Sequence, residues 1–194
     1  MNEKKRNVLV IAGPTGSGKN SVIDGVLGQC QKCTRLVTAT TRAMREGERN
    51  GIDYYFLSKE EFLKAVKDGQ IPEYWHAKET DRHYGTYLPD LEKKISEGKI
   101  VVAHMQIEGA RYFKKHYNAL TLFIVPDSLD ELRRRVLGRQ RDIPDEELEE
   151  RLKIAEVEMS EHAPEYDYTI VNRRDKLNEA IDDVLDILKK EKYL

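Results

Sequence analysis

The chain has 194 residues, of which 39% are hydrophobic and 35% are charged, enough for one globular unit with a well-buried core. A net charge of −2 and an isoelectric point near 6.3 exclude a general binder of nucleic acid or of membrane surfaces, which would carry a large basic excess. The first apolar run is five residues long, too short for a signal peptide, and no run approaches the ~20 residues of a membrane-spanning helix. We therefore expect a cytoplasmic protein.

The stretch Asn7–Leu27 predicts a strand, a phosphate-binding loop and a helix. An apolar run, Val8–Ala12, precedes the turn Gly13-Pro-Thr-Gly-Ser-Gly-Lys19, and apolar residues then return at helical spacing. The spacing of Gly13, Gly18 and Lys19 is that of a P-loop, whose backbone N–H groups and helix N-terminus surround an anion while the lysine reaches the outer phosphates. The alternative is a glycine turn that binds no ligand.

One position departs from the P-loop motif. Asn20 stands where the motif has Ser or Thr, whose hydroxyl would contact Mg²⁺, and Ser21 would point elsewhere on the helix. Further along, Cys30 and Cys33 form a C-x-x-C spacing with no second pair to complete a zinc site. We expect these two cysteines to be inert and reduced.

A β-type run, Arg35–Thr40, leads into an arginine-rich loop. Arg42, Arg45 and Arg49 fall between glycines and precede a predicted strand, Ile52–Leu57. Such a cluster is usually solvated surface. After a phosphate loop it also suits a second anion site, because planar guanidinium groups hold phosphate oxygens bidentately.

The next segment predicts a small mixed α/β region. Ser58 and Glu61 form a capping box for a helix to about Asp68. Two strands, Ile71–Ala77 and His83–Tyr87, follow around a polar turn and carry one carboxylate, Glu73, and a helix then runs between Pro89 and Gly98.

Two continuous apolar strands, Ile100–Ala103 and Leu120–Val125, are typical of the centre of a parallel sheet, with a helix, Glu108–His116, between them. After the second strand, a helix capped at Ser128 carries arginines whose charge lacks matching carboxylates until Asp142. A second helix runs from Pro144 to His162. The arginines of this region are Arg133, Arg134, Arg135, Arg139, Arg141 and Arg151. A solvated helix hairpin explains most of this charge, whereas a mobile cover over phosphates explains the clustering of arginines better.

A last strand, Tyr168–Val171, precedes Asn172 and an amphipathic helix, Lys176–Lys190. Strands that alternate with helices predict a three-layer α/β fold with a mostly parallel central sheet, interrupted by the small mixed region. Ligands should lie at the carboxyl ends of the strands, beside the P-loop.

Taken together, these residues closely resemble the guanylate kinase family of P-loop nucleoside monophosphate kinases. The resemblance runs from Val8 to about Asn172, and its most specific segment is Thr40-Thr-Arg-x-x-Arg-x-Gly-Glu-x-x-Gly-x-Asp-Tyr-x-Phe56. It implies phosphoryl transfer from ATP to GMP and dGMP with bound Mg²⁺, by a monomer or homodimer. It also implies a core of about 1–34, 98–133 and 165–194, a GMP-binding region of about 35–97 and a helical lid of about 134–164.

The resemblance implies roles for individual residues. The implied ATP-binding residues are Gly13, Pro14, Thr15, Gly16, Ser17, Gly18, Lys19, Asn20, Ser21 and Asn172, the last near the adenine. The implied GMP-binding residues are Thr38, Arg42, Arg45, Tyr54, Glu73, Tyr84, Thr86 and Gln106. The implied catalytic residues are Lys19, Arg42, Arg135, Arg139 and Arg151.

Two departures concern the metal and the base. Where the family has an acidic pattern at a strand end, this chain has His104-Met105-Gln106, so Mg²⁺ is expected to be held mainly by ATP phosphates and water, near Asn20, His104 or Glu108. Two alternatives stay open: a nucleotide kinase with another acceptor base, or a non-catalytic guanylate-kinase-like interaction module.

Overall fold

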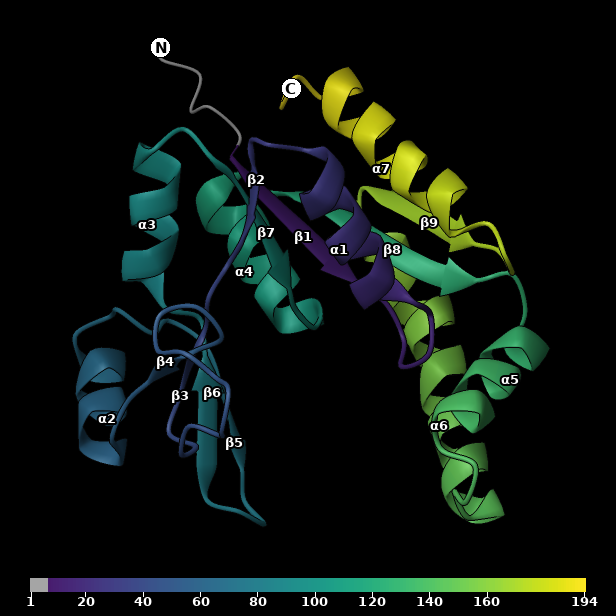
Figure 1. The fold of residues 1–194 in the computed structure, drawn as a ribbon, viewed down its shortest axis with the longest axis horizontal. Helices are drawn as coiled ribbons and strands as arrows, with labels where there is room; N and C mark the ends of the chain where they lie inside the picture. Colours follow the sequence, from purple (N-terminus) through teal and green to yellow (C-terminus); the bar gives the residue numbers. More distant parts are fainter. Residues whose placement is uncertain (1–6) are drawn as a thin grey trace. The chain divides into compact units, whose positions relative to one another are not determined.

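The structure, a computed structural model, describes residues 7–194 and divides into two compact units (Figure 1). The first unit combines Met1–Thr34 with Val102–Leu194, and the second is Arg35–Val101. No helix within residues 7–194 is both long and apolar enough to cross a membrane.

A five-stranded sheet carries the P-loop. Its strands, in spatial order, are β2 (Cys33–Arg35), β7 (Ile100–His104), β1 (Val8–Ala12), β8 (Leu120–Pro126) and β9 (Tyr168–Asn172). β8 pairs in parallel with β1 and with β9. All five residues of β1 are buried, as its uninterrupted apolar sequence predicts for a central strand.

Helices cover both faces of this sheet. α1 (Lys19–Gln29) and α7 (Leu177–Lys190) pack side by side, whereas α4 (Ile107–Tyr117) packs against β1. α1 leads toward one edge of the sheet and α4 toward the other, so right-handed crossovers place them on opposite faces. The predicted three-layer α/β fold is confirmed.

Tyr193, which follows α7, bonds to the backbone at the start of β1 and β8. The Tyr193 hydroxyl donates to the Val8 carbonyl at 3.0 Å and accepts from the Leu120 backbone N–H at 2.9 Å. Tyr193 is therefore tied to the first residues of both β1 and β8.

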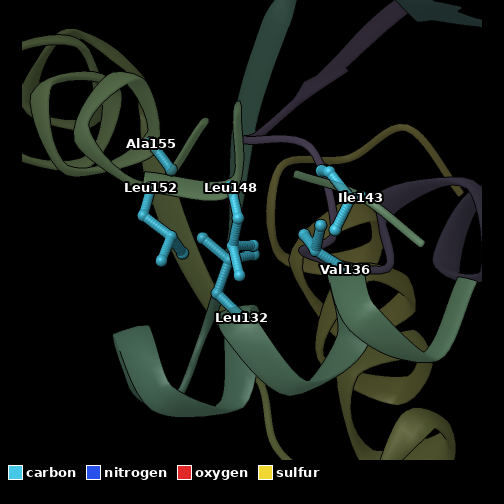
Figure 2. Packing of buried hydrophobic residues seen from close by; sticks show 6 residues of the cluster. All are labelled: Leu132, Val136, Ile143, Leu148, Leu152 and Ala155. Carbon is cyan, nitrogen blue, oxygen red and sulfur yellow. The ribbon is translucent and has the colours of Figure 1, made fainter. Parts of the chain in front are cut away.

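The predicted arginine-rich hairpin is present as α5 (Leu129–Arg139) and α6 (Asp145–Val157), continued by a π-helical turn, Glu158–His162, and a 3-10 turn, Ala163–Glu165. Figure 2 shows the apolar cluster between the helices. Its members are Leu132, Val136, Ile143, Leu148, Leu152 and Ala155. The predicted core–lid boundary at residue 133 falls inside α5, and the lid stays a prediction.

The expectation that this arginine cluster lacks nearby carboxylates is wrong. Arg134 and Arg135 both pair with Glu131 on the same helix, and Arg133 pairs with Glu149 of α6 at 2.7 Å. Residues three and four apart are neighbours on a helix surface, so the N-terminal carboxylate of α5 already supplies the missing negative charge.

The second unit contains a four-stranded sheet and two helices. The strand order is β4 (Tyr55–Phe56), β3 (Ala39–Thr40), β6 (Arg82–Gly85) and β5 (Tyr74–Ala77), and the helices are α2 (Lys59–Lys67) and α3 (Leu88–Ser96). The capping box at Ser58 and Glu61 is confirmed.

Three strands of this unit are shorter than predicted. Ile52 lies in a turn, where its backbone N–H donates to the Arg49 carbonyl at 3.2 Å, so only Tyr55–Phe56 of the predicted strand belong to β4. Ile71 donates to the Ala65 carbonyl of α2 at 3.2 Å and packs into the apolar cluster there. β6 ends at Gly85, and Thr86 is not part of it. Backbone groups that the sequence pattern assigned to strands therefore form hydrogen bonds within a turn or to a helix instead.

The expectation of reduced cysteines is also wrong. Cys30 and Cys33 are joined by a disulfide, and both are buried. The Cys33 N–H donates to the Cys30 carbonyl at 2.9 Å, and this turn brings the two Cα atoms to 5.2 Å, within the range that a disulfide spans.

Candidate functional site

The P-loop turns tightly enough to require glycine at its ends. Gly13 has φ of 147°, and a Cβ there would lie 2.2 Å from the Ile124 carbonyl oxygen of β8. Gly18 has φ of 84°, and its Cβ would lie 2.3 Å from the Asn172 amide nitrogen. The loop thus packs against the carboxyl ends of β8 and β9, which fixes its curvature.

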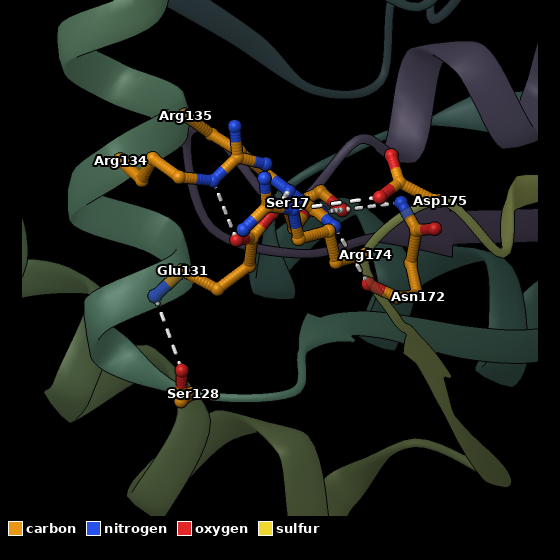
Figure 3. A network of polar contacts seen from close by, with 8 residues as sticks. All are labelled: Ser17, Ser128, Glu131, Arg134, Arg135, Asn172, Arg174 and Asp175. Carbon is orange, nitrogen blue, oxygen red and sulfur yellow. Dashed lines mark hydrogen bonds and ion pairs between the residues drawn. The ribbon is translucent and has the colours of Figure 1, made fainter.

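Asn172 and Arg135 hold the middle of the loop from two other elements (Figure 3). The Ser17 carbonyl accepts from Asn172 Nδ2 at 2.9 Å and from Arg135 Nη1 at 3.0 Å. The Ser17 hydroxyl is fully buried and has no hydrogen-bond partner among residues 7–194. These contacts shape the loop before any ligand is present.

Arg135 is itself held by a buried carboxylate. Its Nε donates to Glu131 at 2.6 Å and its Nη2 donates to the Asn172 carbonyl at 2.9 Å. Hydrogen bonds from Arg134 and Arg135 outweigh the burial of Glu131 and lower the pKa of its carboxyl to about 2. With three of its five N–H groups engaged here, Arg135 keeps two donors for an anion.

Lys19 is half-buried at the start of α1. Its ammonium group donates to the Pro14 carbonyl at 3.3 Å. Burial lowers the pKa of Lys19, opposed by the carboxylate of Glu158 and assisted by the positive charge of Arg139. A cation held in this way is available to an anion that displaces water from the loop.

Cavities lie on both sides of the loop. One of about 380 Å³ is lined by Gly13, Thr15, Lys19, His104, Gln106, Glu108, Glu158 and other residues. The other, of about 330 Å³, is lined by Gly16, Gly18, Ser21, Arg134, Arg135, Arg139, Asn172 and other residues. Both lie at the carboxyl edge of the sheet, where the fold predicts a ligand.

The predicted lid arginines are not all in the same place. Arg135 and Arg139 line the second cavity together with Asn172. Arg151 lies on α6 and pairs with Glu147 at 2.5 Å, and it is absent from the described residues that line the two cavities, as is Asn20. Gln106 lines the Lys19 cavity, and its predicted role toward the base stays a prediction.

The second unit holds the other predicted binding residues. Arg42 is 7% exposed and donates bidentately to Glu48, at 3.0 and 2.7 Å, and to the Ala43 carbonyl at 2.8 Å. Its guanidinium lies 5.5 Å from the centre of the Tyr54 ring, whose edge meets Tyr84. The Nε–H and one Nη2–H of Arg42 stay unused within residues 7–194, and together they form a fork that suits phosphate.

Glu48 also accepts from the Arg45 backbone N–H at 2.8 Å, so one carboxylate holds the Arg42 side chain and the Arg45 backbone. The hydrogen bond to Arg42 lowers the pKa of Glu48, and that to the Arg45 backbone adds to the shift. Sequence reasoning missed this residue as a functional one, although it stands inside the quoted signature. Sequence reasoning missed Glu131 in the same way, because the helix-capping pattern at Ser128 already explained a carboxylate at this position. Its spacing of three and four residues from Arg134 and Arg135 was the signal that could have found it.

The second unit also brings the carboxylate of Glu73 and the hydroxyl of Thr86 together. The Thr86 hydroxyl, which is buried, donates to Glu73. Thr38 is half-buried at the start of β3, and its carbonyl accepts from the Tyr55 N–H at 2.9 Å. Glu73 and Thr86, both predicted to bind GMP, are therefore in direct contact.

A braced phosphate loop on a parallel sheet, with arginines beside it, defines an α/β protein of the P-loop class that binds nucleotides. The guanylate kinase family model matches residues 5–191, so the chain belongs to the guanylate kinase family. Members of this family are ATP-dependent nucleoside monophosphate kinases that phosphorylate GMP and need a divalent metal ion.

Individual relatives agree with this assignment. Guanylate kinase of Bacteroides fragilis is 39% identical over 184 residues, which are 94% of this chain and 88% of that protein. Guanylate kinase of Legionella pneumophila is 35% identical over 89% of this chain and 81% of its own length. The crystal structure of guanylate kinase from Anaplasma phagocytophilum matches with a TM-score of 0.69 and 31% identity, covering 97% of this chain and 87% of that one.

Proposed function

We propose that this chain transfers the γ-phosphoryl group of ATP to GMP and dGMP through the residues described above. The observation that carries the proposal is the P-loop whose Ser17 carbonyl is held by both Asn172 and Arg135, with Lys19 at the start of the helix. Phosphoryl transfer needs positioning and charge neutralisation more than covalent chemistry, and this arrangement supplies both.

ATP binds along the residues Gly13–Ser21. Backbone N–H groups at the start of α1 receive the phosphates, and the Lys19 ammonium contacts the outer ones. Arg135 and Arg139 neutralise the charge that develops on the transferring group from the cavity they share with Asn172. The main role of Asn172 is its hydrogen bond to the Ser17 carbonyl, which holds the loop in the shape that phosphates require.

GMP binds in the second unit. The free fork of Arg42, the guanidinium of Arg45 and the hydroxyls of Tyr54 and Tyr84 hold its phosphate. Glu73 accepts from the guanine N1–H and exocyclic amine, and Thr86 fixes the orientation of that carboxylate, while Thr38 contacts the guanine carbonyl. Adenine has no N1–H, so it would leave Glu73 with the Thr86 hydroxyl but without the donor that guanine N1 supplies.

The metal in this proposal is Mg²⁺, a hard cation that prefers oxygen ligands and keeps several waters. The residues fit such an ion, because Glu108 and Glu158 offer carboxylates in the same cavity as Lys19, whereas the imidazole of His104 is a poor ligand for it. When bound, Mg²⁺ neutralises phosphate charge. The ion would be held mainly by ATP phosphates and waters, with Glu108 and Glu158 accepting from those waters. Asn20 is exposed and less well placed than expected.

The helix pair α5–α6 is proposed as a lid over ATP, in a cytoplasmic enzyme that acts as a monomer or homodimer. Arg151 would leave Glu147 for the phosphates when the lid closes and excludes water. Hydrogen exchange across residues 133–151 should slow when a bisubstrate analogue binds. Unchanged exchange there would contradict a lid.

An ATP-consumption assay with GMP, dGMP, IMP, AMP, UMP and CMP tests the proposal. We expect turnover with GMP and dGMP, and a kcat/KM for AMP lower by about 10³-fold or more. Similar values for AMP and GMP would contradict the role of Glu73 and favour the kinase of altered acceptor base. Absence of turnover with all six would favour the interaction module.

A further inference from the structure

The β5–β6 hairpin gathers three side chains that metal ions use as ligands. His76 and His83 are direct cross-strand partners, and Asp81 stands in the turn between the strands. One ligand atom from each of the three residues lies within 4.8 Å of the others. Among residues 7–194, no other group of three histidine, cysteine or acidic side chains meets this condition.

Two of the three ligand atoms already have nearly the spacing that a metal requires. His76 Nε2 lies 2.8 Å from Asp81 Oδ1. In a tetrahedral site with bonds of about 2.0–2.2 Å, neighbouring ligand atoms are about 3.3 Å apart. The imidazoles of His76 and His83 are stacked with centroids 4.2 Å apart. His76 and Asp81 are the exposed members, so rotation of their side chains can bring them toward the fixed ring of His83.

His83 provides an independent observation. The residue is 5% exposed and lies against the rings of Phe62 and Tyr74, and its Nδ1 has no hydrogen-bond partner among residues 7–194. A buried polar atom without a partner is costly and calls for an explanation in a native structure. Burial also lowers the pKa of His83, which keeps the ring neutral with a lone pair free for coordination.

We propose that His76, Asp81 and His83 bind a divalent transition-metal cation of the zinc type, with water in the fourth position. Two imidazoles and one carboxylate are the donor set of such ions, whereas Mg²⁺ and Ca²⁺ select oxygen. Lys59 donates to the other carboxylate oxygen of Asp81 at 2.6 Å and so leaves Oδ1 directed to His76. The site does not depend on the proposed kinase activity.

Zinc titration of the nucleotide-free protein tests the proposal. The Cys30→Ser/Cys33→Ser chain is the background, so that thiolates released by reduction of the disulfide cannot bind the metal. We expect binding of one Zn²⁺ by calorimetry, a rise in Tm with zinc concentration, and the visible spectrum of a tetrahedral site when Co²⁺ replaces zinc. An excess of Mg²⁺ should not displace the zinc.

His76→Gln and Asp81→Asn should each weaken zinc binding by about 10-fold or more and remove the zinc-dependent rise in Tm. Both residues are exposed, so these variants keep the fold even if replacing the buried His83 does not. His116→Gln, on α4, is the matched control and should bind zinc like the background. Undiminished binding to His76→Gln and Asp81→Asn, displacement of zinc by Mg²⁺, or absence of one-to-one binding would each overturn the proposal.

Discussion

The two regions proposed to bind phosphate hold their arginines in different ways. In the P-loop corner, which comprises Gly13–Gly18, Glu131, Arg135 and Asn172, contacts join three elements that are far apart in sequence. In the arginine loop, residues 41–53, Arg42 is held by Glu48 and Ala43, both close by in the chain. Each arginine gives three N–H groups to the protein and keeps two for a ligand.

This difference predicts whether a substitution should change the stability of the fold as well as the binding of a substrate. The P-loop corner is made by packing of the first unit, so its loss should change stability as well as binding. The arginine loop is made by its own residues, so its loss should change binding of one substrate and leave the fold intact. The predictions below test this contrast.

The largest expected effect is on catalysis, at Lys19, which follows the P-loop corner at the start of α1. Lys19→Ala should lower kcat by about 10²-fold or more, because the lysine charge acts on the transferring phosphates. The Tm of the nucleotide-free protein should change little, since Lys19 makes only one hydrogen bond to Pro14. Lys32→Ala, an exposed lysine after α1, is the control. Retention of more than a third of the normal rate would remove the P-loop kinase interpretation.

Glu131→Gln should reduce the free energy of unfolding by about 1.5–3 kcal/mol at neutral pH, because two arginines lose a charged partner. The folded pKa of Glu131, about 2, lies below the usual 4.5. The stabilisation from its charge is therefore complete above the usual value and is lost as pH falls from about 4.5 toward about 2.

Urea unfolding of both chains across this pH range measures the effect. The stability difference between wild type and Glu131→Gln should shrink as the pH falls. A difference that stays constant down to the lowest pH would show that the carboxylate charge is not what holds Arg134 and Arg135.

Glu48→Gln should raise the KM for GMP by about 10-fold, since one charged hydrogen bond is worth about that factor in positioning Arg42. The KM for ATP and the Tm should stay close to those of the wild type. Glu46→Gln, an exposed carboxylate in the same loop, is the matched control. A drop in Tm as large as that of Glu131→Gln would mean that the arginine loop also supports the fold.

The smallest expected effect on activity lies outside both regions. Cys30→Ser/Cys33→Ser should lower stability by no more than about 2 kcal/mol, because a cross-link between residues three apart restrains little of the unfolded chain. Turnover should be unchanged. Thermal unfolding and the GMP assay measure the two quantities, and a clear loss of activity would extend the P-loop corner to the end of α1.

Local patterns in the sequence predicted much of the fold. Uninterrupted apolar runs located β1, β7, β8 and β9, and the capping residues Ser58 and Ser128 located the starts of α2 and α5. Strand ends were less predictable, because turn hydrogen bonds at Ile52 and Ile71 compete with the sheet. The disulfide was missed because spacing alone says nothing of the geometry of the turn.

The site was predicted as a set of ligand-binding residues and not as a set of contacts. Motifs identify Lys19, Arg42 and Arg135, since each must meet a phosphate. They do not show that Glu48 and Glu131 hold two of these arginines, because a carboxylate near arginines on the surface is common. Burial of Arg42 in one pair and of Glu131 in the other is what gives these contacts weight. Roles toward the two nucleotides stay predictions until they are measured.

The hydroxyl of Tyr193 has a consequence for the order in which the chain acquires its structure. The N-terminal part of a chain emerges first during synthesis, yet the Val8 carbonyl and the Leu120 N–H share a partner that lies 185 and 73 residues further along the chain. In a chain that folds as it is synthesised, β1 and its phosphate loop can therefore pair with β8 before this contact forms. Tyr193→Phe would remove the shared partner of these two backbone groups, at the edge of the sheet opposite the P-loop.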